Sequence, residues 1–247
     1  MAVPSASAST LSVLAVALAV LIALSTGTAA ASQGGSGRVV VQPTQALAIL
    51  LGPHAAMSAP DESSAALELV RAKRPITEER TVLPVIGHTS GVDGVGWLQV
   101  LLPGRPNGHT GWIKLRATRA ALTSWHIVVD TNGRRVIVYW KGRSVRVFKA
   151  IVGKPATPTP GGEFFVEEVI QLRAGDVGAP FALALSARSN VLQEFAGGPG
   201  QIALHGLKNV GGVLGSAVSH GCVRLANAAM RWLVIRIGPG VPVTIKS

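Results

Sequence analysis

Cysteine and aromatic residues are scarce in this sequence, and each shortage excludes a class of protein. The 247 residues contain one cysteine, Cys222, so the chain cannot form an internal disulfide and is not a disulfide-stabilised scaffold. Aromatic residues make up only 4% of the chain. Because the basic residues are spread along short Val-rich runs, without a recognition helix or an aromatic stacking surface, nucleic acid is not expected as a partner.

Acidic residues are also few, and their distribution divides the chain. There are 12 Asp and Glu against 23 Lys and Arg, which gives a formal net charge of +11. Residues 38–118 carry 8 basic and 6 acidic side chains, whereas residues 119–247 carry 15 and 6. The half that contains Cys222 is therefore the strongly basic half, and its field favours an anionic partner.

Long apolar runs are absent except for one at the start, from Leu11 to Leu24. It is shorter than the ~20 residues that a membrane-spanning helix needs. The run is followed by Ala29-Ala30-Ala31, which is typical of a cleavage site, so residues 1–31 are predicted to be the signal peptide of an exported protein. The first ten residues lack Lys and Arg, so an uncleaved leader is the alternative, and only then would the protein contact the membrane.

The segment after the leader predicts a linker and a small β domain. Residues 32–37, Ser-Gln-Gly-Gly-Ser-Gly, have the composition of a flexible linker. Residues 38–118 then contain short strand-like runs, and the region between two of them, Gly52–Ser64, is expected to be irregular. The expected strands are Arg38–Gln42, Ala46–Leu51, Val82–Ile86, Trp97–Leu102 and a strand that begins at Gly111.

The last two of these runs are joined by Pro106-Asn107-Gly108-His109, a hairpin turn signal. This hairpin resembles the closing hairpin of bacterial SH3-like modules in exported wall proteins. The resemblance implies a small SH3-like β-barrel over 38–118, to which no ligand is assigned. The alternative is an ordinary hairpin in which Trp97 and Trp112 belong to the core.

Residues 123–247 predict a second β-rich domain with one helix near its C-terminus. Two successive hairpins form a meander, and a Pro-rich loop at 153–162 separates it from the later strands. Asn227 is a candidate N-cap for the helix, whose apolar face contains Met230, Leu233, Val234 and Ile237. The expected strands are Trp125–Asp130, Arg134–Trp140, Ser144–Val152, Glu163–Ile170, Phe181–Leu185, Gln201–Leu204 and Val241–Ile245.

Cys222 is preceded by Ser219-His220-Gly221, and His205 lies seventeen positions before it. A cysteine thiol becomes a strong nucleophile when an imidazole takes its proton, so this pair is suited to acyl transfer. No Asp or Glu is close in sequence to either residue, so a backbone carbonyl is expected to orient the imidazole. Backbone N–H groups around Gly221 and Cys222 are the expected oxyanion hole. The structural alternatives for Cys222 are a buried small apolar residue or an intermolecular disulfide.

Together with the segment Thr157-Pro158-Thr159-Pro160-x-Gly162-x-Phe164, the Ser-His-Gly-Cys motif and its upstream histidine resemble the signature of YkuD-type L,D-transpeptidases. The resemblance covers roughly residues 123–246. It implies that Cys222 is the nucleophile, that His205 is the base, and that the Gly206 carbonyl orients His205. The residues implied to shape the acyl-enzyme site are Ser219, His220 and Gly221, and Arg224 falls where some members have Arg and others Asn.

The resemblance also implies an activity. Cys222 would attack the third residue of a peptidoglycan stem peptide and release the terminal D-alanine, and a neighbouring stem would then take the acyl group to form a 3→3 cross-link. Hydrolysis instead of transfer would make the protein an L,D-carboxypeptidase. Carbapenems are expected to acylate Cys222, and no cofactor or metal is implied. Surface or core positions are therefore expected for the other histidines, namely His54, His88, His109 and His126.

Three site residues have two interpretations each. His220 is expected to fix the loop by a hydrogen bond, with proton transfer as the alternative. Ser219 either donates to the substrate or shapes the turn, and Arg224 either pairs with a stem carboxylate or is a solvated cation.

A papain-like wall-lytic peptidase is disfavoured because those enzymes place cysteine before histidine. A wall-binding protein without catalysis is the remaining alternative.

Overall fold

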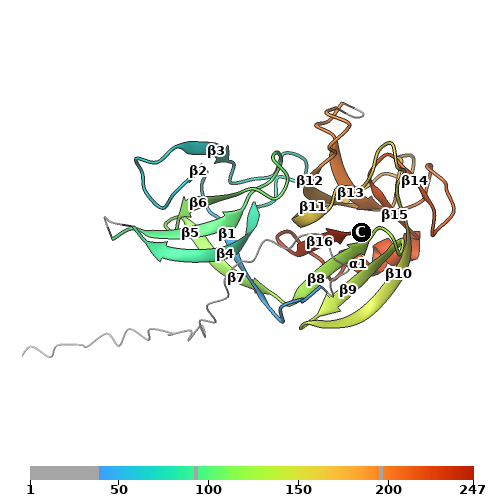
Figure 1. The fold of residues 1–247 in the computed structure, drawn as a ribbon, viewed down its shortest axis with the longest axis horizontal. Helices are drawn as coiled ribbons and strands as arrows, with labels where there is room; N and C mark the ends of the chain where they lie inside the picture. Colours follow the sequence, from blue (N-terminus) through green and yellow to red (C-terminus); the bar gives the residue numbers. More distant parts are fainter. Residues whose placement is uncertain (1–38, 92–93, 195–196) are drawn as a thin grey trace, which may run out of the picture. The chain divides into compact units, whose positions relative to one another are not determined.

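A computed structural model describes residues 39–91, 94–194 and 197–247, and Arg38–Ser247 form one compact unit. The predicted signal peptide (1–31) and linker (32–37) lie outside the described residues. Within the described residues, the chain forms two β-sheets and one helix, so the prediction of a mostly β fold is confirmed (Figure 1). No helix in this part of the chain is long and apolar enough to cross a membrane.

The first sheet has seven strands, ordered β3-β2-β6-β5-β4-β1-β7, and neighbouring strands in it are antiparallel. The predicted hairpin around Pro106 is the β5–β6 pair, which confirms it. Whether the sheet is an SH3-like module stays a prediction. The strands are β1 (Gln45–Leu50), β2 (His54–Met57), β3 (Ala66–Val70), β4 (Val82–Ser90), β5 (Gly96–Leu101), β6 (Thr110–Lys114) and β7 (Thr118–Thr123).

The second sheet has nine strands, ordered β14-β10-β15-β13-β12-β11-β16-β8-β9. Because β9 also pairs with β10, the sheet closes on itself, and the predicted meander is the antiparallel succession β8, β9, β10. The helix α1 (Asn227–Val234) packs against β12. The strands are β8 (Trp125–Asp130), β9 (Arg135–Trp140), β10 (Arg143–Gly153), β11 (Gly162–Gln171), β12 (Phe181–Arg188), β13 (Gln201–His205), β14 (Ala217–Ser219), β15 (Val223–Leu225) and β16 (Pro242–Lys246).

Strand β11 contributes to both hydrophobic cores. Successive side chains of a strand point to opposite faces. Phe164 accordingly joins the core of the second sheet, whereas Phe165 is buried in the core of the first. Each fully buried phenylalanine stabilises the fold by about 2 kcal/mol relative to an exposed one. β11 thus belongs to the second sheet but supplies a side chain to the core of the first, so the two sheets are parts of one compact unit.

Two adjacent buried carboxylates follow on β11, where the pairing with β12 shifts register between Val166 and Glu168. Glu167 pairs with Arg188 of β12 (3.0 Å) and with Arg74 (2.9 Å), which follows β3. Glu168 accepts hydrogen bonds from the backbone N–H and the hydroxyl of Thr77. Because a buried carboxylate is costly without partners, these contacts fix the segment after β3 against the second sheet.

Several expectations for local structure were wrong. Residues 39–42 form no strand, although Arg38–Gln42 was predicted as one. The region expected to be irregular, Gly52–Ser64, contains β2, because its short run His54–Met57 pairs with β3. Asn227 is not the N-cap of α1: Ala226 occupies that position without a side-chain hydrogen bond, and Asn227 is the first helical residue.

Candidate active site

The strands β13 and β15 bring His205 and Cys222 to one cavity. They are parallel neighbours, with Leu204 opposite Val223 and His205 opposite Arg224. Cys222, one residue before Val223, is therefore level with Ala203, and His205 follows on the same face of β13, since side chains alternate. Both side chains line a cavity of about 230 Å³. Residues that are seventeen positions apart thus meet because of strand pairing.

A backbone carbonyl fixes the orientation of the His205 imidazole. Nδ1 lies 2.8 Å from the Gly206 carbonyl oxygen, which can only accept a hydrogen bond. Nδ1 therefore carries the proton, and Nε2 keeps the lone pair that a base requires. A carbonyl was expected in this position because no carboxylate is close in sequence, and Gly206 is the residue that the family resemblance implied.

Gly178 forms the floor under the imidazole. Its N–H donates to the Lys208 carbonyl, and its own carbonyl accepts from the Gly206 N–H at 2.7 Å. Its φ is +85°, and a Cβ at this position would come 2.4 Å from His205 Nδ1. Only glycine fits here, because any side chain would displace the ring. Gly178 lies in none of the motifs recognised in the sequence.

The turn that carries Cys222 is stabilised by hydrogen bonds within the turn and by hydrogen bonds from the Pro-rich loop behind it. Inside, the buried Ser219 hydroxyl donates to the Cys222 carbonyl at 2.6 Å and accepts from the Gly221 N–H at 3.1 Å. From behind, Thr159 donates to the Gly221 carbonyl at 2.8 Å, and Thr157 donates to the Ser219 carbonyl at 3.2 Å. Of the two interpretations of Ser219, its contacts favour the turn-shaping one.

Burial controls the protonation of both reactive groups. It raises the pKa of the Cys222 thiol, a shift that the Ala203 N–H and the Arg224 charge partly oppose. Burial lowers the pKa of His205, the Gly206 carbonyl opposes this, and Arg224 adds to it. Both shifts therefore favour a neutral thiol and a neutral imidazole at neutral pH.

The remaining predicted residues surround this pair. His220 is exposed and lines the cavity. Gly221 has its N–H occupied by Ser219, so that N–H is not a free oxyanion donor. Arg224 lines the cavity and donates to the Gly211 carbonyl at 3.4 Å, while its buried Nε has no hydrogen-bond partner among the described residues.

Asn227 has a role that the sequence analysis missed. Its side-chain oxygen accepts from the Leu207 N–H at 2.9 Å, two residues after His205. The start of α1 is thereby tied to the segment that leaves β13. A polar residue at a helix start suggested a cap, but sequence alone gave no signal for a contact twenty residues away.

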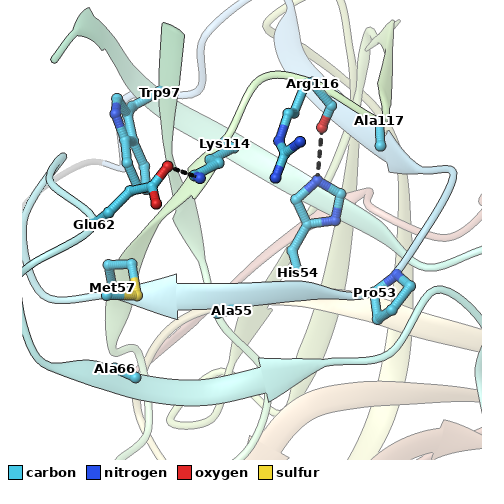
Figure 2. Close-up of a pocket in the computed structure, with 10 residues that line it drawn as sticks. All are labelled: Pro53, His54, Ala55, Met57, Glu62, Ala66, Trp97, Lys114, Arg116 and Ala117. Carbon is cyan, nitrogen blue, oxygen red and sulfur yellow. Dashed lines mark hydrogen bonds and ion pairs between the residues drawn. The ribbon is translucent and has the colours of Figure 1, made fainter. Parts of the chain in front are cut away.

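A larger cavity, of about 530 Å³, lies in the first sheet (Figure 2). Figure 2 shows the Lys114 ammonium paired with Glu62 and His54 Nε2 bonded to the Arg116 carbonyl, at 2.9 Å. This cavity contains no cysteine and shares no lining residue with the Cys222 cavity. Across the described ranges, no group of three or more His, Cys, Asp or Glu side chains could hold a metal ion.

Comparison with known proteins agrees with this geometry. Residues 124–245 match the model of the YkuD family, described as the L,D-transpeptidase catalytic domain. The YkuD protein of Bacillus licheniformis is 33% identical over 124 residues, which cover 49% of this chain and 65% of that protein. The YkuD protein of Bacillus subtilis is 27% identical over 146 residues, covering 59% of this chain and 73% of its own.

Among solved structures, an L,D-transpeptidase from Mycobacterium smegmatis shares 17% identity at a TM-score of 0.38. The match covers 62% of this chain and 90% of that one. This likeness is too distant to say more about the site. The family match over 124–245 contains both Cys222 and His205. The second half of this chain therefore carries the L,D-transpeptidase catalytic domain of the YkuD family.

Proposed function

We propose that this protein is an exported peptidoglycan L,D-transpeptidase that forms 3→3 cross-links through a thioester on Cys222. The observation that carries the proposal is the cavity shared by Cys222 and His205, in which the Gly206 carbonyl leaves Nε2 free to accept a proton. The family match supports the reaction class. The substrate, the acceptor and the location in the cell wall or periplasmic space belong to the proposal.

The first half-reaction forms the thioester. Cys222 Sγ bonds to the carbonyl carbon of the third stem residue while His205 Nε2 takes the thiol proton. The resulting oxyanion would be stabilised by the Cys222 N–H, since the Gly221 N–H is occupied. The carbon–nitrogen bond to D-alanine then breaks, and His205 returns the proton to the leaving amine.

The second half-reaction transfers the acyl group. The side-chain amine of the third residue of another stem attacks the thioester carbon and gives its proton to His205. The carbon–sulfur bond breaks, and the Cys222 sulfur takes that proton back, so the enzyme is restored. Water in place of the amine would give the carboxypeptidase reaction instead.

Arg224 is suited to bind a substrate carboxylate. It lies opposite His205 across the strand pair, and its buried Nε lacks a partner among the described residues. An unpaired buried donor is satisfied best by an anionic acceptor, and stem peptides carry several carboxylates. A β-lactam presents both a carboxylate and a strained carbonyl, so carbapenems should acylate Cys222 by opening of the ring amide.

The test uses the protein from about Ser32, purified disaccharide-tetrapeptide and mass spectrometry, beside Cys222→Ala. A dimer lighter than two substrates by one alanine, absent with Cys222→Ala, is the expected result. Tripeptide alone would make the protein an L,D-carboxypeptidase. Cross-linking that persists in Cys222→Ala would refute the cysteine mechanism. Unchanged substrate together with binding to isolated walls would favour the wall-binding alternative.

A further inference from the structure

The loop between β5 and β6, residues 102–109, belongs to the first sheet but binds the chain beside the Cys222 cavity. Arg105 is the centre of this contact. Its Nη1 donates to the Pro199 carbonyl at 3.0 Å, and its Nη2 donates to the carbonyls of Ser189 (2.9 Å) and Leu192 (3.3 Å). One planar guanidinium thus joins the carbonyls of Ser189, Leu192 and Pro199, a geometry that suits its forked donors.

Asn107 of the same loop binds the backbone of Arg188, the residue directly before Ser189. Its side-chain oxygen accepts from the Arg188 N–H at 2.8 Å, and its side-chain nitrogen donates to the Arg188 carbonyl at 2.7 Å. The amide therefore satisfies both backbone groups of Arg188, as a neighbouring strand would. Asn107 also donates to the Asn190 side chain at 3.0 Å.

The backbone held in this way lies at one wall of the Cys222 cavity, which is lined there by Ser189, Leu192, Gly200 and Gln201. The Ser189 N–H donates to the Gly200 carbonyl at 2.8 Å, so these two lining residues are joined directly. Packing at Gly200 is tight, because a Cβ there would come 2.0 Å from the Leu192 carbonyl oxygen.

The same wall reaches the nucleophile. Arg188 is opposite Gln201 in the β12–β13 pair, so the backbone that Asn107 binds is paired directly with Gln201. The Gln201 carbonyl oxygen lies 4.0 Å from Cys222 Sγ. A displacement of Arg188 would therefore be transmitted through one strand pair to the edge of the cavity beside the thiol.

These contacts are separate from those that hold the two sheets together. Arg74 pairs with Glu167, and Thr77 with Glu168, on the strand β11 that also carries Phe165 into the first core. None of these residues lines the Cys222 cavity. The first sheet can therefore stay attached to the second without Arg105 and Asn107, which leaves these two residues to position the wall.

We propose that Arg105 and Asn107 are positioning residues, through which the first sheet sets the shape of the substrate cavity. This inference rests on the proposed function, because it concerns the binding of the acyl donor. If this cavity wall binds the substrate and the transition state with equal free energy, the loss of that binding raises KM and leaves kcat unchanged. Arg105→Ala and Asn107→Ala should each raise KM for the tetrapeptide about tenfold and change kcat less than about twofold.

The experiment measures steady-state kinetics and thermal unfolding of the whole protein for four variants: Arg105→Ala, Asn107→Ala, Arg105→Lys and Thr77→Val. Thr77→Val removes one contact between the sheets without touching the wall, so it should keep the wild-type KM at a similar loss of stability. Arg105→Lys keeps the positive charge but lacks the two guanidinium nitrogens that reach the three carbonyls. Its KM should therefore be raised as in Arg105→Ala. A wild-type KM in Arg105→Ala and Asn107→Ala, or in Arg105→Lys, would overturn the proposal.

Two measurements distinguish a failure of this inference from a failure of the proposed function. A wild-type protein without transfer or carboxypeptidase activity would refute the proposed function alone. The wall can still be tested without substrate, because amide hydrogen exchange at Ser189, Leu192 and Gln201 should be faster in Arg105→Ala than in Thr77→Val. Equal exchange in the two variants would refute the positioning role whatever the substrate is.

Discussion

The His205 imidazole lies directly over Gly178, so that a single added Cβ would come 2.4 Å from Nδ1. The imidazole thus lies between a carbonyl that selects its tautomer and a glycine whose missing side chain leaves room for the ring. Positioning of the ring depends on the absence of a side chain as much as on the presence of a hydrogen bond.

Gly178→Ala is expected to reduce acylation of Cys222 about 100-fold. The added methyl group would displace the His205 ring, and a displacement of about 1 Å is enough for a loss of this size. The alanine also has to adopt a φ of +85°, which costs about 1 kcal/mol of stability. Acylation by a carbapenem, followed by intact-protein mass spectrometry, measures the first effect, and urea unfolding measures the second. Wild-type acylation in a folded Gly178→Ala variant would show that the ring is not held at this position.

Alkylation of Cys222 by iodoacetamide should be slow at neutral pH and should increase only above pH 9, because burial raises the thiol pKa. The acid limb of kcat/KM for transfer should lie below pH 6.5, since burial lowers the pKa of His205 and the base must be unprotonated. Fast alkylation at pH 7 would instead indicate a resting thiolate–imidazolium pair.

Arg224→Gln should move two pH dependences to higher pH: the rise in Cys222 alkylation and the acid limb of kcat/KM for transfer. The Arg224 charge lowers the pKa of the thiol, because it favours the thiolate, and lowers the pKa of His205, because it disfavours the imidazolium. Its removal therefore raises both values. Titration of alkylation and of transfer in the same variant measures the two shifts, and opposite shifts would show that Arg224 does not act through its charge.

Thr159→Val should destabilise the protein by about 1–3 kcal/mol, because the Gly221 carbonyl and the Gly153 N–H both lose their partner in a buried site. Acylation of Cys222 should fall as well, since this bond supports the turn before it. Thr159→Ser keeps the hydroxyl and is the matched control. If serine and valine behaved alike, the methyl group rather than the hydrogen bonds would be what the site requires.

His126 should make the protein sensitive to mild acid. Burial lowers its folded pKa from 6.5 to about 4, so between these values the unfolded chain binds a proton that the folded chain does not. Stability is therefore full above pH 6.5 and falls by up to about 3 kcal/mol as the pH decreases to 4. The Glu163 carboxyl, whose pKa is raised by partial desolvation although the residue is exposed, acts in the opposite direction near its own titration.

His126→Gln keeps a polar partner for Thr244, which bonds His126 Nε2 at 2.8 Å, but cannot titrate. Urea unfolding of both proteins between pH 4 and 7 measures the difference. The variant should have the flatter profile. A difference between the two that did not change with pH would exclude titration of His126 as its cause.

Much of the second sheet could be predicted because its signals are local. The hairpins around Thr131 and Lys141 lie between alternating apolar runs, and the strand that ends at His205 follows the same pattern. A backbone carbonyl was predicted to orient His205 because no carboxylate was close in sequence, and the resemblance to YkuD-type proteins implied that it belongs to Gly206. The catalytic roles of Cys222 and His205 remain predictions that the experiments above address.

The features that sequence did not reveal depend on distant partners. The short run His54–Met57 is a strand only because β3 and β6 lie on either side of it. Gly178 resembles any other loop glycine until His205 is packed on it. Asn107 lies in the recognised turn and Arg105 directly precedes it, but their partners are about 80 to 95 residues further along the chain. Local patterns carry no information about such pairs.

The contribution of β11 to both hydrophobic cores has a consequence for the order in which the chain can fold. A ribosome completes residues 45–123 of the first sheet before it reaches Phe165, which that sheet needs for its core. The part of the protein that is synthesised first therefore cannot finish packing until part of the second sheet has followed it. Until then, its apolar interior is open to chaperones, proteases and neighbouring chains.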